Sequence, residues 1–84
     1  MSTPSAFTVH LKLARQTAKL SLNQVGRLLG TSATYIYNVE TGRSAVSAKR
    51  LDELLDIYSV SNAETRTLLH KYREQAKTQR SAQS

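Results

Sequence analysis

The sequence predicts an all-α protein, one small domain built from five helices. Apolar residues recur three and four positions apart along most of the chain, which is the spacing of one helix face. A serine stands before most of these periodic stretches and a glycine closes two of them, as capping residues do. The 84 residues allow a single domain with a modest core, and without cysteine no disulfide strengthens it.

Apolar spacing predicts the first helix, and capping residues delimit the second. One face of the first helix carries Phe7, Leu11, Ala14 and Ala18. The second helix is expected over residues 22–29, with Ser21 as its N-cap and Gly30 as its end. Gly26 inside this helix lowers its propensity by up to about 1 kcal/mol relative to alanine. We therefore expect another helix to cross closely at this glycine.

The third helix is expected over residues 33–40, after a turn of three residues. Ser32 is its predicted N-cap, Ile36 and Val39 point inward, and Gly42 ends the helix. Two short helices joined by a tight turn that contains glycine form a helix-turn-helix, in which the second helix crosses the first with one side exposed.

The fourth and fifth helices follow a loop. Ser47 is expected to cap the fourth helix, which runs to about Tyr58 with an apolar stripe at spacings of three and four. Ser61 and Glu64 have the spacing of a capping box, which predicts that a fifth helix begins there and runs to about Ala76.

We expect three segments along the chain. Residues 1–5 form a flexible N-terminal arm, residues 6–76 form the helix-turn-helix domain, and residues 77–84 form a disordered C-terminal tail because they lack an apolar pattern. Four basic residues of the last helix and tail are expected to be a solvated face: Lys71, Arg73, Lys77 and Arg80.

The net charge of +6 lies entirely in the first fifty residues. That part holds seven Lys and Arg against Glu40 alone, whereas residues 51–84 hold equal numbers of basic and acidic residues. A basic half joined to a neutral half suggests one surface for a polyanion. The alternative is a generally cationic, solvated surface, and charge alone does not decide between the two.

Several classes of function are not supported by the sequence. There is no apolar stretch long enough for a membrane span or a signal peptide, so we expect a cytoplasmic protein. His10 and His70 stand alone, which predicts no metal site. No nucleophile elbow, phosphate loop or zinc-protease motif is present, so we expect neither an enzyme nor a cofactor.

The exposed start of the third helix has residues suited to duplex DNA. A helix fits the major groove, where asparagine can bond adenine with two hydrogen bonds and alanine or threonine can meet the thymine methyl. Ala33, Thr34 and Asn38 are such residues, and no acid precedes Glu40 in this helix to repel phosphate. Without the surrounding motif, Asn38 alone would indicate only a surface position.

The segment from Leu20 to Arg43 resembles the helix-turn-helix core of the lambda-repressor-like family, which comprises phage repressors, Cro and xenobiotic-response-element regulators. The matching framework is Leu20, Ser21, Val25, Gly26, Leu29, Gly30, Ser32, Ile36, Val39, Glu40, Gly42 and Arg43. The resemblance extends from about Phe7 to Tyr72. It implies a compact five-helix DNA-binding domain of a bacterial or phage transcriptional regulator, most similar to a repressor.

The resemblance implies roles for individual residues. Base readout would come from Ala33, Thr34, Tyr35 and Asn38. Phosphate contacts would come from Ser21, Thr41 and Arg43, and we add Ser32 and Tyr37, although Tyr37 has the alternative of covering the turn. Lys49 and Arg50 stand in the first turn of the fourth helix, where the helix dipole disfavours cations, so a nearby phosphate would explain them better than plain solvation.

The resemblance also implies a structural ion pair and shows three departures. Arg15 would pair with Glu40, which would account for the one acid in the basic half. Three positions differ from the common family residues, namely Leu22, Leu28 and Val46, and Leu22 removes one expected polar contact with the DNA backbone.

The predicted function is therefore sequence-specific binding of double-stranded DNA by a transcriptional regulator. One domain of this size covers little DNA, so we expect a homodimer on two half-sites, formed through the fifth helix or through a C-terminal domain outside these residues. Leu28, Leu68 and Leu69 are the candidate exposed apolar positions for such a contact. The alternative is a protein-interaction module on the same fold, similar to an antitoxin or a coactivator domain.

Overall fold

The computed structural model describes the backbone of residues 5–83 and the side chains of residues 5–76. The described chain forms five helices, α1 (Ala6–Thr17), α2 (Leu22–Leu29), α3 (Ala33–Glu40), α4 (Ala48–Ile57) and α5 (Ala63–Gln83). The predicted all-α class is confirmed, and the bounds of α2 and α3 are those predicted. Of the expected arm at 1–5, only Ser5 lies within the described residues, and it caps α1.

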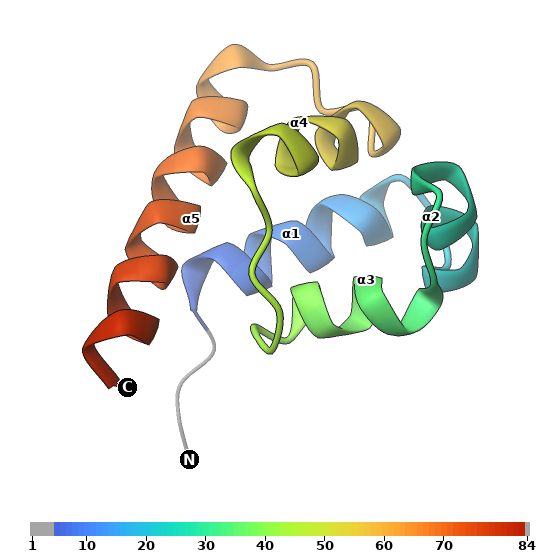
Figure 1. Ribbon diagram of the computed structural model, residues 1–84. Helices are drawn as coiled ribbons and strands as arrows, with labels where there is room; N and C mark the ends of the chain where they lie inside the picture. The colour runs from blue at the N-terminus through green and yellow to red at the C-terminus, as the bar shows by residue number, and fades with distance from the viewer. Residues whose placement is uncertain (1–4, 84) are drawn as a thin grey trace.

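The helices surround one core with α3 along one edge of the molecule. In Figure 1, α1 crosses the middle below α4, α5 stands along the left side, and α2 and α3 close the right side and the bottom. The core consists of Phe7, Leu11, Val25, Ile36, Val39, Val46, Leu51, Leu54, Leu55, Tyr58 and Leu69. Every described helix contributes to this list, so the position of α3 is set by packing against the whole core.

Polar caps determine where the helices begin. The hydroxyl of Ser21 accepts the backbone N–H of Gln24, whose side chain accepts the N–H of Ser21 in return, which completes a capping box. Ser32 and Ser47 cap α3 and α4, as predicted. The predicted capping box at the start of α5 is wrong.

Asn62 caps α5 instead of Ser61. Asn62 Oδ1 accepts the N–H of Thr65 at 2.9 Å, and its carbonyl accepts the N–H of Arg66 at 3.0 Å. Asparagine is at least as good an N-cap as serine, so the start of the helix is displaced by one residue from the spacing that Ser61 and Glu64 suggested.

Helix α5 is longer than the sequence predicts. It continues to Gln83, whereas an end near Ala76 and a disordered segment at 77–84 were expected. The expectation of disorder came from the missing apolar pattern, but residues 77–83 contain neither glycine nor proline and include lysine, arginine, alanine and glutamine. Their intrinsic preference for helix allows α5 to continue without an apolar face.

Gly26 lies where the turn into α3 touches α2. A Cβ placed on this glycine would lie 2.7 Å from the backbone carbon of Ser32 and 2.9 Å from the backbone nitrogen of Ala33. The predicted close approach is therefore present, and its partner is the backbone at the start of α3. Because a backbone cannot turn away as a side chain can, Gly26 fixes how tightly the two helices meet.

We predict that Gly26→Ala lowers the free energy of unfolding by about 1–3 kcal/mol, the usual result of overpacking. Helix propensity alone would predict the opposite sign. Urea denaturation followed by circular dichroism measures the change. Asn23→Ala, at an exposed position of the same helix, serves as control and should change stability by less than about 0.5 kcal/mol. A Gly26→Ala protein as stable as the unmodified one would contradict the close approach.

Candidate nucleic-acid interface

Helix α3 presents a polar face to solvent. Ile36, Val39 and Glu40 are buried, which turns the opposite side of the helix outward. Thr34 and Tyr37 are exposed and Asn38 is half-buried on that outward side, with Thr41 following at the C-cap. These four positions recur at the spacing of one helix face, so the structure brings them together. Ala33 is half-buried beside them.

The two tyrosines of α3 differ in environment. Tyr37 is 49% exposed on the outward face. Tyr35 is half-buried against the core, and the guanidinium of Arg50 lies 6.0 Å from its ring centroid, a cation–π contact. Arg50 also donates to the carbonyl of Leu29 at 3.4 Å. Arg50 thus links α2, α3 and α4, and Tyr37 is the tyrosine that lies with Thr34 and Asn38.

The residues after α3 form an anchored loop with exposed basic and polar groups. The carbonyl of Asn38 accepts the N–H of Arg43 at 2.8 Å and that of Ser44 at 3.1 Å. Thr41 Oγ1 donates to the carbonyl of Tyr37 at 2.9 Å, an intrahelical bond that a hydrogen bond to phosphate would have to replace. The Arg43 side chain is exposed. Lys49, in the first turn of α4, is exposed as well.

The end of α3 is held in the core by a carboxylate. Glu40 Oε2 accepts Arg15 Nε at 2.7 Å, and the two side chains are only 4% and 12% exposed. Tyr58 Oη donates to the same oxygen at 3.5 Å, and Arg15 Nη1 donates to the carbonyl of Leu20 at 2.8 Å. The pair that the resemblance implied is present, and it joins α1, α3, α4 and the turn before α2.

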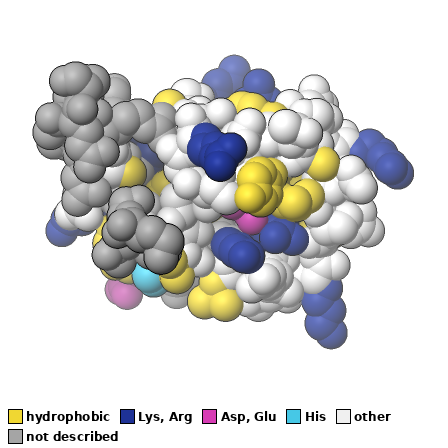
Figure 2. Space-filling view, turned by 90° about the horizontal axis from the view of Figure 1, so that it is seen from below, with side chains coloured by type: hydrophobic (Ala, Val, Ile, Leu, Met, Phe, Trp, Pro, Cys, Tyr) yellow, Lys and Arg dark blue, Asp and Glu magenta, His cyan; other side chains and the backbone are white. Residues whose placement is uncertain are grey.

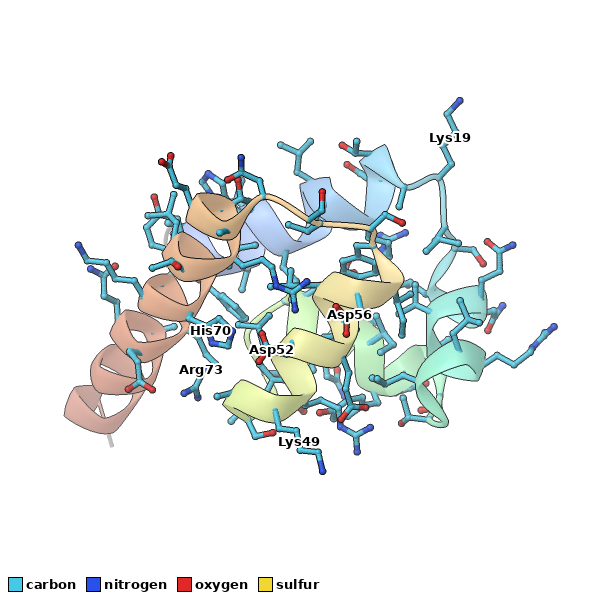
Figure 3. All side chains as sticks on the ribbon, turned by 90° about the horizontal axis from the view of Figure 1, so that it is seen from above. Lys19, Lys49, Asp52, Asp56, His70 and Arg73 are labelled. Atoms are coloured by element: carbon cyan, nitrogen blue, oxygen red, sulfur yellow. The ribbon has the colours of Figure 1, made fainter. Side chains whose placement is uncertain are left out.

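The acidic residues other than Glu40 all belong to α4 and α5. Among residues 5–50 the one acid is the buried, paired Glu40, so the remaining charged side chains there are basic. Figure 2 looks at the molecule from below, onto α3, and shows basic side chains around a hydrophobic cluster with few acidic ones in view. Figure 3 looks from above and shows Asp52 and Asp56 on α4, with Asp52 next to His70 of α5. The face with α3 is therefore suited to an anion.

Two of the three acids of α4 have partners on α5. Arg66 contacts the carboxylates of Asp52 and Asp56 at 3.3 and 3.0 Å, and His70 Nε2 donates to Asp52 at 2.7 Å. The hydrogen bond from His70, with the positive charge of Arg66, lowers the pKa of Asp52 below its ordinary value. His10 donates from Nδ1 to the carbonyl of Ala6 at 2.7 Å. The described residues contain no group of three potential metal ligands among His, Cys, Asp and Glu.

The comparisons with known proteins place this geometry in a family. Residues 6–68, most of the chain, match the sequence profile of a family described as "Helix-turn-helix domain". The chain belongs to this helix-turn-helix family. No curated protein and no solved structure matches the chain. The matched residues include α2 and α3, two short helices joined by a tight turn, and the family is one of DNA-binding domains.

The helix-turn-helix domain also exposes some apolar side chains. Leu28 on α2 is 63% exposed and Leu68 on α5 is 41% exposed, as expected, but Leu69 is buried in the core. Val9 and Leu13 on the outer side of α1 are exposed too. No helix within the described residues has the length and apolar character that crossing a membrane requires.

Sequence reasoning missed one residue next to the α3–α4 loop. Arg73, expected to be solvated, is buried to 16% exposure and donates from Nη1 to the carbonyl of Val46 at 3.1 Å. Neighbouring residues in the sequence give no sign of this contact, because Val46 lies 27 positions away. Tyr58 was expected only as an apolar core residue, and its hydroxyl reaches Glu40.

We predict that Glu40→Ala lowers the free energy of unfolding by about 3–5 kcal/mol, since it leaves Arg15 buried without a counter-charge. Replacing both partners, Arg15→Met with Glu40→Leu, should recover most of that loss. Urea denaturation measures both. Asp56→Ala breaks an exposed ion pair and, as control, should cost no more than about 1 kcal/mol. Similar losses for the single and double variants would contradict a buried pair.

We also predict that the helix-turn-helix domain loses stability above pH 10. Burial, together with the nearby Glu40 carboxylate, raises the pKa of Tyr58 above its ordinary value of 10.0. The unfolded chain therefore loses this proton at a lower pH than the folded chain, so stability falls as pH rises past 10.0. Tyr58→Phe should show a smaller decrease in urea midpoint over that range. An equal decrease in both proteins would contradict the assignment.

Proposed function

We propose that this protein is a sequence-specific, double-stranded-DNA-binding transcriptional regulator, of a repressor type, with α3 in the major groove. The observation that carries the proposal is the outward face of α3, which is polar, lacks an exposed acid and is surrounded by basic side chains. A protruding helix of this kind fits the groove, and helix-turn-helix domains dock in this way.

Base readout is assigned to Ala33, Thr34, Tyr35 and Asn38. Thr34 and Asn38 lie on the outward face, which supports direct contacts with base edges. Tyr35 lies at the edge of that face beneath Arg50, which supports a contact where the groove meets the backbone. Tyr37 is exposed on the other side of Thr34 from Asn38, at the edge of this face, which supports a contact with the DNA backbone rather than with a base.

Phosphate contacts are assigned to residues around α3, namely Ser21, Ser32, Tyr37, Thr41, Arg43, Lys49 and Arg50. Arg43 and Lys49 are exposed and have no ion-pair partner among the described side chains. Arg50 already contacts Leu29 and Tyr35, which supports a role in holding α2, α3 and α4 together, with a weaker contact to phosphate. Cations of this kind supply affinity that does not depend on sequence.

Two copies on one DNA site would complete the regulator. A single domain of this size buries only about 600–1,000 Å² on DNA, which is small for a specific complex. Two domains on half-sites one helical turn apart would double the contact. We propose that the copies meet through α5 or through a domain outside these 84 residues.

Selection of bound duplexes from a random pool, followed by titration at several salt concentrations, tests the proposal. Log K should fall with log salt by about 0.9 per phosphate contact, and the selected sites should reveal the half-site spacing. Binding that is absent, or insensitive to salt, would contradict DNA binding and favour the protein-interaction alternative.

Two substitutions separate base readout from phosphate contact. Asn38→Ala should lose about 1–3 kcal/mol of discrimination at one base pair of the selected site. Arg43→Ala should weaken binding to all sequences alike. It should also reduce the slope of log K against log salt by about 0.9, the value for one phosphate contact. Lys71→Ala removes the same charge from an exposed position of α5 and serves as control. Measured on a single half-site, where no contact between copies is needed, it should change neither property. Unchanged preference in Asn38→Ala would show that this residue does not read a base.

A further inference from the structure

The part of α5 beyond the family match packs against the body of the domain. The match ends at residue 68, and nothing in it concerns the next two turns. In those turns Leu69 is buried, and Tyr72 and Ala76 are half-buried against the core. Arg73 lies beside them, one turn beyond His70, on the side of α5 that faces α4 in Figure 3.

Arg73 is committed to the loop between α3 and α4. Its Nη1 donates to the carbonyl of Val46 at 3.1 Å, and its Nη2 pairs with the carboxylate of the neighbouring Glu74. The side chain is 16% exposed, and within residues 5–76 its buried Nε has no hydrogen-bond partner. The guanidinium therefore connects α5 to the backbone of the loop through its Nη1 atom.

The loop is thereby held at both ends. At its start, the N–H groups of Arg43 and Ser44 both donate to the carbonyl of Asn38. At its end, the Val46 side chain is buried in the core and its carbonyl accepts from Arg73. Between these anchors, the side chain of Arg43 is exposed on the basic face.

We propose that Arg73 is a positioning residue for DNA binding. It fixes the loop before DNA binds, so that the loop that carries Arg43 does not have to become ordered when Arg43 contacts a phosphate. The inference rests on the proposed function. Ordering a loop and a long side chain on binding costs free energy, and a loop that is fixed beforehand avoids part of that cost. Through Arg73, the orientation of α5 is coupled to the loop that follows the recognition helix.

Arg66 provides a matched control on the same helix. Its guanidinium also links α5 to the body, through the carbonyl of Val60 at 2.8 Å and the carboxylate of Asp56 at 3.0 Å. It makes no contact with residues 43–46 among the hydrogen bonds and ion pairs of the described side chains. Arg66→Met and Arg73→Met therefore remove comparable groups with different connections.

Amide hydrogen exchange of the free protein tests the contact with the loop. Arg73→Met keeps the apolar stem and should speed exchange about tenfold at Arg43 and Ser44, because the loop opens locally more often. The Tyr58 amide, bonded within α4, should be unaffected. Arg66→Met should leave the exchange rates of the loop amides unchanged. Arg73→Lys keeps a donor and the positive charge, so its loop amides should exchange more slowly than those of Arg73→Met. This variant replaces Arg73→Met in the test if the methionine variant folds poorly.

DNA binding tests the consequence. Arg73→Met should bind the selected duplex about tenfold more weakly, with a salt slope reduced by roughly one contact, as in Arg43→Ala. The double variant should bind no more weakly than Arg43→Ala alone, since both changes remove the same phosphate contact. Additive losses would overturn the inference by showing that Arg73 acts separately from Arg43.

The two proposals fail in different ways. Loop amides that exchange at the normal rate in Arg73→Met, in a protein that binds DNA, overturn the positioning role and leave the proposed function standing. An unmodified protein that binds no duplex overturns the proposed function, and the DNA role of Arg73 with it.

Discussion

The buried carboxylate of Glu40 is the group on which the arrangement of this domain most depends. It stands at the last position of α3, where it accepts from Arg15 of α1 and from Tyr58 at the C-cap of α4. A buried charge without a partner is strongly destabilising, so this geometry is favoured only when all three helices are in register. The orientation of α3, and with it the direction of its outward face, is determined by this contact as well as by apolar packing.

Burial of Glu40 also determines the electrostatics of the outer surface. Because Arg15 neutralises it, the single acid of the first fifty residues adds no negative potential around α3. The acids that the chain does expose are held on the α4–α5 side, where Arg66 and His70 bind two of them. One structural ion pair thus stabilises the fold and leaves the surface around α3 predominantly basic, which favours association with a polyanion.

The sequence predicted the helix-turn-helix more accurately than the rest because its boundaries are set by local chemistry. Serine caps and the glycine at position 30 act within a few residues, and α2 and α3 begin and end where they indicate. At the start of α5, the spacing of Ser61 and Glu64 predicted the wrong cap, because the adjacent Asn62 can cap a helix as well as serine does.

The side chains of the candidate site were harder to predict, because contacts distant in sequence decide their environment. Periodicity places Tyr35 and Tyr37 on different sides of α3, but only Arg50, fifteen positions after Tyr35, shows which ring is covered. Likewise, the sequence predicts that Arg73 is a solvated surface cation. Its hydrogen bond to the carbonyl of Val46, 27 residues earlier, is revealed only by the structure.

The burial of the main ion pair has a consequence for how DNA binding responds to salt. Dissolved ions screen exposed charges over about 8 Å at physiological ionic strength, but they screen buried pairs much less. The contact between Arg15 and Glu40 is excluded from solvent, and the loop is anchored by hydrogen bonds to backbone carbonyls rather than by exposed ion pairs. Raising the salt concentration should therefore weaken phosphate contacts while the position of α3 and its loop is kept. For this domain, the salt slope reports the number of phosphates bound and not the loss of the scaffold that binds them.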